Sequence, residues 1–252
     1  MQRADILLVE KALASTRTQA QRLLKEGRVS ILENGQLQLL TKAGTKLNFD
    51  TEFIIQADPS DRYVSRGALK LEGALQQFSI DIKAAVAIDV GQSTGGFTDC
   101  LIQAGAASVV GIEVGHDQLA DSLRALDNVT CYEGVNAREL PASLLKHTPN
   151  EQGFDIAVMD VSFISQTKIL PSLVPLIRSG GTLISLVKPQ FEVGKAGIGK
   201  GGIVKESRLF AEVESLINST CQVLGLTIKG YIESPIKGGD GNREFLLWAV
   251  KP

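Results

Sequence analysis

The chain has 252 residues, with 26 Lys and Arg against 28 Asp and Glu, so its formal net charge is −2. This length allows one large domain or a large domain with a small companion, and 44% hydrophobic residues suffice for a sizeable core. The composition excludes a disordered or collagen-like chain, and no apolar run approaches the ~18 residues of a membrane span.

Cysteine, histidine and acid positions narrow the class of protein further. The three cysteines are odd in number and widely spaced, and only two histidines are present, which argues against a disulfide framework and a zinc site. Acids at Asp5 and Glu10 interrupt the apolar stretch that a signal peptide needs. We therefore expect a cytoplasmic protein without integral membrane association, and the near-zero charge taken alone argues mildly against a nucleic-acid partner.

Residues 1–58 read as a small module of helices followed by short strands. Apolar residues at helical spacing predict a helix over 5–13, and Thr16 is a favoured N-cap for a second helix that stops at Gly27. The polar, proline-broken segment 57–61 is the predicted linker. Between helices and linker we predict strands at 29–32, 37–40 and 53–56, and a turn at 33–35.

From about residue 62, apolar strands alternate with helical windows, which predicts a second domain over 59–252. This alternation is typical of an α/β fold with a doubly wound, mostly parallel, seven-stranded Rossmann-like sheet. No helical window separates the last two strands, so we expect the last strand to run antiparallel. The predicted strands are 86–90, 108–114, 129–132, 155–160, 181–187, 226–233 and 244–250, and the predicted helices are 66–78, 95–104, 116–125, 163–177 and 205–223.

A glycine-rich turn follows the first strand of this sheet, in the run Asp89-Val90-Gly91-Gln92-Ser93-Thr94-Gly95-Gly96-Phe97. Its glycines let the backbone approach a ligand closely, and the helix that follows offers unpaired N–H groups to an anion. Glu113 ends the second strand about 20 residues later, where a carboxylate is placed to accept both hydroxyls of a ribose. Strand, turn, helix and acid at this spacing predict a nucleoside ligand.

The turn also indicates which nucleoside is bound. It lacks the G-x-G-x-x-G pattern of dinucleotide binders and the P-loop of ATP and GTP binders. Asp89-Val90-Gly91 resembles the first motif of S-adenosylmethionine-dependent methyltransferases, which implies Asp89 near the cofactor's ammonium. Asn136 then lies near the adenine or, equally plausibly, caps a helix over 137–146. The predicted cofactor-binding set is Asp89, Gly91, Ser93, Thr94, Gly95, Gly96, Phe97, Glu113, Asn136 and Asp160.

Charged residues on separate elements point to a reaction site. Asp160 closes the fourth strand, Lys188 closes the fifth, Glu244 begins the last, and Lys70 lies on the helix over 66–78. An antiparallel last strand begins at the edge where the parallel strands end, so we expect these side chains beside the cofactor cleft. Any one of them alone is more commonly a structural ion pair.

These motifs resemble the hemolysin A/TlyA family, a branch of the FtsJ-like (RrmJ-type) ribose 2′-O-methyltransferases, over nearly the whole chain. The resemblance implies a ribose 2′-hydroxyl of ribosomal RNA as substrate, within ribosomal subunits, and S-adenosylmethionine as methyl donor. In this scheme Lys188 accepts or polarises the hydroxyl proton, a cation such as Lys70 favours its neutral form, and no metal is required. The family's Lys-Asp-Lys-Glu tetrad matches Lys70, Asp160, Lys188 and Glu244, and the most specific segments are 63–70, 91–98, 160–164, 186–195 and 241–248.

The segment Thr16–Val29 resembles an S4 RNA-binding domain, although Thr16 replaces the usual Ser and Ala43 the usual Pro. Residues 11–28 hold five basic residues against one acid, so local charge outweighs the near-neutral average. Two glycine-rich loops, at 194–202 and 237–243, flank the predicted site, and we expect the first to act as a lid. The predicted RNA-binding residues are Arg3, Lys11, Arg17, Arg22, Lys25, Arg28, Arg66, Lys195 and Lys200.

Other functions fit the sequence less well. The chain lacks the glycine motif of an NAD-dependent oxidoreductase and the nucleophile elbow of a Ser-His-Asp hydrolase. The complete tetrad argues against a catalytically silent RNA-binding protein. The sequence has no strongly amphipathic cationic stretch, which argues against a membrane-active hemolysin. The sequence leaves open the modified nucleotide, the ribosomal subunit, the oligomeric state and the orientation of the small domain.

Overall fold

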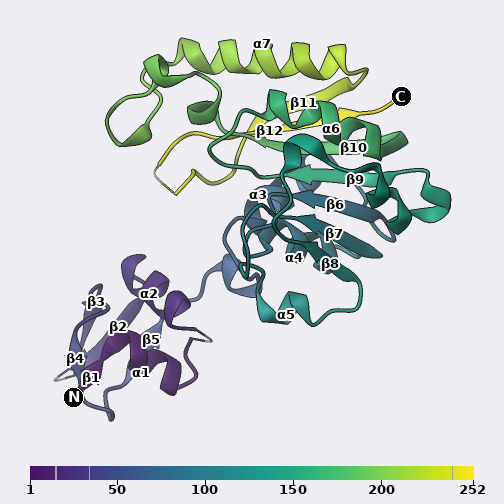
Figure 1. The fold of residues 1–252 in the computed structure, drawn as a ribbon. Coiled ribbons are helices and arrows are strands. Elements are labelled where there is room, and N and C mark those ends of the chain that lie inside the picture. The colour runs from purple at the N-terminus through teal and green to yellow at the C-terminus, as the bar shows by residue number, and fades with distance from the viewer. Residues whose placement is uncertain (15, 34, 240) are drawn as a thin grey trace. The chain divides into compact units, whose positions relative to one another are not determined.

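The computed structural model describes residues 1–14, 16–33, 35–239 and 241–252, so the centre of the predicted turn at 33–35 lies outside the described residues. The chain divides into two compact units, Met1–Asp61 and Arg62–Pro252 (Figure 1). The break between them follows the last residue of the predicted linker. No helix of the described residues is both long and apolar enough to span a membrane.

The N-terminal unit packs two helices against a small antiparallel sheet. Strand β2 (Val29–Glu33) lies between β3 (Gln36–Leu40) and β5 (Phe53–Ile55), and helices α1 (Ala4–Glu10) and α2 (Arg17–Lys25) supply Leu8, Leu23 and Leu24 to its core. Thr16 caps α2, since its Oγ1 accepts a hydrogen bond of 3.1 Å from the Gln19 N–H. The first helix is shorter than predicted, and two short paired strands were not predicted: β1 (Gln2–Arg3) and β4 (Lys46–Leu47).

The second unit confirms the predicted α/β fold. Its seven strands lie in the order β11-β12-β10-β9-β6-β7-β8, and β12 runs antiparallel to both neighbours, as expected from the missing helix before it. The strands are β6 (Val86–Val90), β7 (Ser108–Ile112), β8 (Val129–Tyr132), β9 (Phe154–Met159), β10 (Ile177–Val187), β11 (Thr227–Glu233) and β12 (Phe245–Val250), and the helices are α3 (Ala68–Gln77), α4 (Gly96–Gln103), α5 (Asp121–Arg124), α6 (Leu170–Leu173) and α7 (Arg208–Val223).

Three predicted helices are wrong in extent. The window 116–125 forms only α5, because Asp117 adopts a positive φ of 55° that a helix cannot continue through. The window 163–177 breaks into α6 and flanking 3₁₀ turns, with prolines inside that remove backbone donors. The segment 137–146 likewise forms two 3₁₀ turns.

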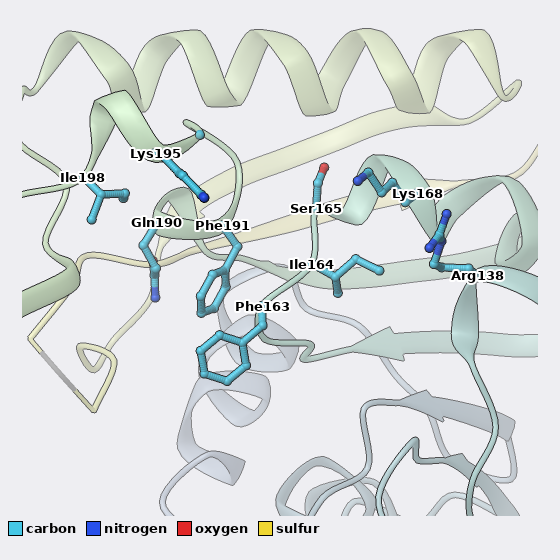
Figure 2. A pocket seen from close by; sticks show the side chains of 10 residues that line it. Arg138, Phe163, Ile164, Ser165, Lys168, Gln190, Phe191, Lys195 and Ile198 are labelled. Carbon is cyan, nitrogen blue, oxygen red and sulfur yellow. The ribbon is translucent and has the colours of Figure 1, made fainter.

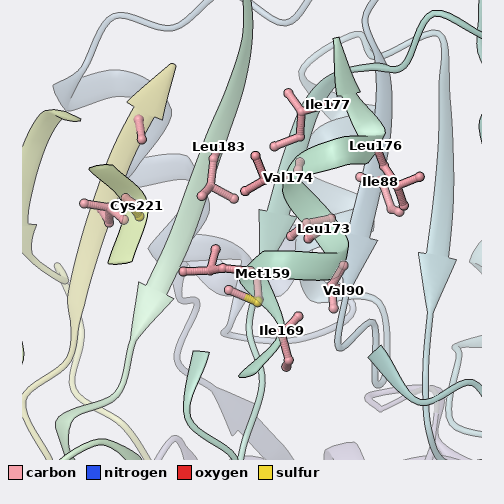
Figure 3. Packing of buried hydrophobic residues seen from close by; sticks show 14 of the residues in the cluster. Ile88, Val90, Met159, Ile169, Leu173, Val174, Leu176, Ile177, Leu183 and Cys221 are labelled. Atoms are coloured by element: carbon pink, nitrogen blue, oxygen red, sulfur yellow. The ribbon is translucent and has the colours of Figure 1, made fainter. Parts of the chain in front are cut away.

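Strand side chains alternate between two cores, one on each face of the sheet. Ile88, Met159 and Leu183 face the core covered by α6 and α7 (Figure 3), whereas Ala87 and Val158 face the core covered by α3 and α4. Apolar residues on both faces explain why the strands read as continuous hydrophobic runs.

Chain order reverses between β6 and β9, because the chain proceeds from β6 outward to β8 and then returns to the other side of β6. Ligands of open α/β sheets bind at such a switch point, outside the carboxyl ends of the strands. The loops that follow β6 and β9 therefore define the candidate site.

Candidate active site

Glycine is required where the loop after β6 passes the loop after β9. Gly91 has a φ of +83°, and a Cβ built on it would lie 2.5 Å from the carbonyl oxygen of Asp160. Gly95, at a φ of +94°, precedes α4, and a Cβ there would lie 2.4 Å from Leu123 Cδ1. The predicted turn is thus a close approach of backbone to backbone, which a larger residue could not make.

Asp89 lies beneath this loop. Its side chain has no exposed surface, and Oδ2 accepts a hydrogen bond of 2.7 Å from Thr98 Oγ1, which in turn accepts one of 2.9 Å from Gln92 Nε2. Oδ1 has no hydrogen-bond partner in the described part of the chain. Burial raises the pKa of Asp89 to about 7, and the charge of Asp160 acts in the same direction.

Three predicted cofactor residues occupy distinct environments. Glu113 is buried and accepts hydrogen bonds of 2.8 Å from the N–H groups of Ser93 and Gly115. Asn136 is exposed and caps a 3₁₀ turn, with Oδ1 accepting from the Arg138 N–H at 3.1 Å, so the capping alternative is observed. The Phe97 side chain is buried in the core that α3 and α4 cover.

Lys188, which follows β10, lies close to two groups that follow β9. Its Nζ lies 2.5 Å from Asp160 Oδ1 and 2.9 Å from Ser162 Oγ. The two strands run parallel and adjacent, so their carboxyl ends bring these groups together.

A second ion pair joins α3 to Glu244, the residue before β12. Lys70 Nζ of α3 donates to Glu244 Oε2 at 2.6 Å, and both side chains are buried. Lys70, Lys188 and Glu244 line one cavity of about 340 Å³, together with Ser162 and Asn242. The structure thus brings three members of the predicted tetrad to one cavity, and the fourth, Asp160, is paired with one of them.

A larger cavity of about 620 Å³ adjoins the first. The two share Phe163, Gln190, Phe191 and Ile198 as lining residues. Figure 2 shows Arg138 and Lys168 on the right of this cavity and Phe163 and Phe191 on its left, with ring centroids 5.1 Å apart. The cations Arg138, Lys168 and Lys195 face an apolar floor, an arrangement suited to an anionic ligand that carries flat rings.

Comparison with known proteins decides the family. A model of the FtsJ-like methyltransferase family matches residues 63–251. The chain belongs to the FtsJ-like methyltransferase family. This family membership confirms the FtsJ-like resemblance inferred from the sequence, and S-adenosylmethionine is accordingly the cofactor.

Relatives extend the similarity over both units. A candidate rRNA methyltransferase of Bacillus subtilis, YqxC, is 44% identical over 98% of this chain and 84% of its own length. The 16S/23S rRNA (cytidine-2′-O)-methyltransferase TlyA of Mycobacterium tuberculosis is 40% identical over 98% of this chain and 88% of its own. A solved structure of a candidate hemolysin from Streptococcus thermophilus has a TM-score of 0.77 at 40% identity, covering 99% of this chain and 88% of that one.

The residues of this FtsJ-like site fit S-adenosylmethionine. Glycine at position 91 lets this loop pass Asp160 where a Cβ would collide, and Glu113 keeps lone pairs for ribose hydroxyls beside its two backbone donors. The unpartnered Oδ1 of Asp89 supplies negative charge beneath the loop, which favours a cation above it. Because Asp89 is sealed from the surface, direct contact with an ammonium would require the loop to open.

The glycine-rich loops are tied to each other. Asn242 Nδ2 donates to the Gly202 carbonyl at 3.0 Å, and its Oδ1 accepts from the Val204 N–H at 3.2 Å. One further contact, a bridge between Ile198 and Val204, closes the first loop on itself. Asp240, in the predicted second loop, lies outside the described residues.

Some of the predicted RNA-binding side chains are exposed, and others bond to groups of the protein itself. The prediction that Arg28 binds RNA needs correction, because the side chain is buried and its guanidinium donates to Asp61 at 2.6 and 2.9 Å. Lys11 donates to the Thr51 carbonyl at 3.0 Å and lies over the Phe49 ring. The remaining side chains that lie exposed at the surface are Arg17, Lys25, Arg66, Lys195 and Lys200, with Arg3 and Arg22 partly exposed.

Sequence reasoning missed several side chains that line the two cavities. Ser162 and Phe163 lie only two and three residues beyond Asp160, so their position after a strand end was a usable signal. Phe163 is 92% exposed and has a positive φ of 64°, an unusual conformation for an aromatic residue. Arg138 and Lys168 carried no comparable signal in the sequence, whereas Asn242 lies in the segment 241–248 that resembles the family.

Proposed function

We propose that this protein transfers a methyl group from S-adenosylmethionine to ribose 2′-hydroxyls of ribosomal RNA. Family membership and the names of the relatives support this reaction, since one relative is named for cytidine-2′-O methylation. The observation that carries the proposal is the pair of Lys–carboxylate contacts, 2.5 and 2.6 Å long, around one cavity beside the switch point.

Lys188 is the proposed proton acceptor. In the neutral form that this role requires, a lysine has two N–H donors and one lone pair; Ser162 Oγ accepts from Nζ at 2.9 Å, and Asp160 Oδ1 lies 2.5 Å from Nζ. The lone pair is then left for the proton of a hydroxyl in the cavity. After transfer, the Lys188 ammonium is held by the Asp160 carboxylate, while the oxygen that lost the proton becomes the nucleophile.

Bound S-adenosylmethionine would supply a sulfonium methyl group, which an oxygen nucleophile takes as the carbon–sulfur bond breaks and a neutral thioether leaves. Lys70 lines the same cavity, where its ammonium would donate toward the substrate oxygen, and Glu244 fixes that ammonium from a buried position. Orientation of the ribose by these groups matters as much as the proton transfer, because aligned geometry lowers a barrier by up to ~7–11 kcal/mol.

The cavity of about 620 Å³ is the proposed path of the RNA strand beyond the reacting ribose. Arg138, Lys168 and Lys195 would contact phosphates, and the exposed Phe163 ring offers a surface for a base to stack on. The N-terminal unit, which resembles an S4 domain, is the proposed additional RNA-binding unit, acting on RNA within ribosomal subunits. We propose the same site residues as in the sequence analysis, without Arg28 and the Phe97 side chain.

Mapping of ribose methyls tests this function. Ribosomal RNA from cells with and without the protein is digested and analysed by mass spectrometry, and the deletion strain is complemented with wild type or Lys188→Ala. We expect at least one 2′-O-methyl nucleotide to disappear on deletion and to return only with wild type. An unchanged set of ribose methyls would refute the proposal.

A further inference from the structure

A buried carboxylate organises two arginines in the N-terminal unit. Asp5, the second residue of α1, has no exposed surface, yet it accepts four hydrogen bonds. Its Oδ1 accepts from Arg3 Nε at 2.9 Å, and its Oδ2 accepts from Arg3 Nη2 at 3.0 Å, Arg17 Nε at 2.9 Å and Gln21 Nε2 at 2.7 Å. The hydrogen bonds from Arg3 come first among the causes that hold the pKa of Asp5 well below its usual range.

The two guanidiniums keep donors beyond their contacts with Asp5. The Arg3 and Arg17 side chains are 43% and 55% exposed, respectively. A guanidinium carries five N–H donors, and the hydrogen bonds found among the described residues use neither Nη1 of Arg3 nor the terminal nitrogens of Arg17. One carboxylate against two guanidiniums leaves a net charge of about +1, and Lys46 is paired with Arg3 across β1 and β4.

We propose that Arg3 and Arg17, positioned by Asp5, form a preformed clamp for a backbone phosphate of RNA. Two arginines this close would repel and move independently in water, and the buried carboxylate both offsets the repulsion and fixes their planes. A phosphate meeting this pair finds oriented donors whose side-chain entropy is already restricted. The clamp rests on the proposed RNA substrate and assigns to Asp5, an acid, a positive contribution to RNA affinity.

Asp5→Asn tests the clamp through the sign of its effect. The substitution adds +1 to the net charge, so bulk electrostatics predict tighter RNA binding, whereas the clamp predicts weaker binding because the guanidiniums lose their orientation. The probe is unmodified ribosomal RNA made by in vitro transcription, titrated with the full-length chain at several KCl concentrations. We expect the dissociation constant to rise roughly tenfold, the effect of about one charge-assisted hydrogen bond.

Two charge-matched variants test the clamp if Asp5→Asn unfolds the N-terminal unit. Arg17→Gln leaves Asp5 with Arg3 and Gln21, and Lys42→Gln removes an equal charge from an exposed side chain of the same unit that is not among the proposed RNA-binding residues. The clamp predicts a clearly larger loss of affinity for Arg17→Gln, and a salt slope reduced by about 0.7–0.9 per lost phosphate contact. Thermal unfolding checks that each variant is folded.

The outcomes separate the clamp from the proposed function. If folded Asp5→Asn binds RNA as tightly as wild type or more tightly, or if Arg17→Gln and Lys42→Gln behave alike, the clamp is wrong. If wild type neither binds nor methylates the RNA, the proposed function fails instead. Weaker binding by Asp5→Asn and Arg17→Gln, with wild-type S-adenosylmethionine affinity, supports the clamp.

Discussion

The two units of the chain use charge in opposite ways. Around the catalytic cavity each lysine meets one carboxylate, at 2.5 Å for Lys188–Asp160 and 2.6 Å for Lys70–Glu244. In the N-terminal unit one buried carboxylate meets two partly exposed guanidiniums. Local neutrality suits a site that positions a neutral hydroxyl, whereas a local excess of positive charge suits the capture of phosphates.

A pair of aspartates sharpens this contrast. Asp5 and Asp89 both have no exposed surface, but the pKa of Asp5 is held below its usual range by arginines and that of Asp89 is raised to about 7 by burial. Burial alone therefore does not decide whether an acid is charged. The partner within hydrogen-bond distance decides it.

Lys188→Ala carries the largest expected effect. Loss of the proton acceptor should lower kcat for methyl transfer by roughly 10² to 10⁴, while RNA and cofactor affinity stay near wild type. Ser162→Ala, which removes one of the groups that orient Lys188, should cost less. Initial rates with a tritiated methyl donor measure both variants, and the exposed Lys229→Ala serves as the control of equal charge. Near-normal turnover by Lys188→Ala would end its assignment.

Deletion of residues 1–61 asks whether RNA affinity resides in the first unit. Losing one of two linked binding units should weaken RNA binding on the order of 10²-fold, and should leave S-adenosylmethionine binding unchanged. Filter binding and isothermal titration calorimetry measure the two affinities. Equal RNA affinity of the truncated and full-length chains would contradict the claim that the first unit supplies RNA affinity.

Asp89→Asn tests the buried acid through pH. Because its pKa is raised in the folded chain, the folded state binds more protons than the unfolded state between about pH 4 and 7, so the stability of wild type falls as pH rises through that window. The Asn variant should lose this fall, and its S-adenosylmethionine affinity should drop because the charge is gone. Thermal unfolding across pH 4–8 compares the two proteins, and identical profiles would contradict the account of Asp89.

Gly91→Ala tests, through stability, the close approach of the loops that follow β6 and β9. A Cβ at Gly91 meets the Asp160 carbonyl at 2.5 Å, whereas Gly225 has a similar φ of +81° and open space around it. We expect Gly91→Ala to cost roughly 3 kcal/mol or more and to weaken cofactor binding, and Gly225→Ala to cost about 1 kcal/mol. Urea unfolding measures both, and equal costs would show that the close approach is unimportant.

Sequence patterns predicted the sheet well because buried parallel strands read as continuous apolar runs, and the missing helix before β12 predicted its direction. Helical windows failed where prolines or a positive φ interrupted them, as at Asp117. The tetrad residues could be predicted to meet at one edge, since strand ends converge there. Which lysine pairs with which carboxylate depends on side-chain geometry that no spacing reveals.

Tertiary contacts account for the other misses. Arg28 was predicted to bind RNA, but its guanidinium is hydrogen-bonded to Asp61, which lies 33 residues further along the chain. The cations of the larger cavity, Arg138 and Lys168, come from separate loops and show no common pattern in the sequence. Asp5 was noted only as an interruption of an apolar stretch, because two of its partners, Arg17 and Gln21, lie on another helix.

Position-specific detection of the transferred methyl tests the central claim most directly. Unmodified ribosomal RNA is incubated with the protein and a methyl-deuterated donor, and the product nucleosides are identified by mass spectrometry. The account predicts the label on a ribose 2′-oxygen with wild type, none with Lys188→Ala, and none on DNA of the same sequence. Label on a base, or undiminished ribose labelling by Lys188→Ala, would contradict it.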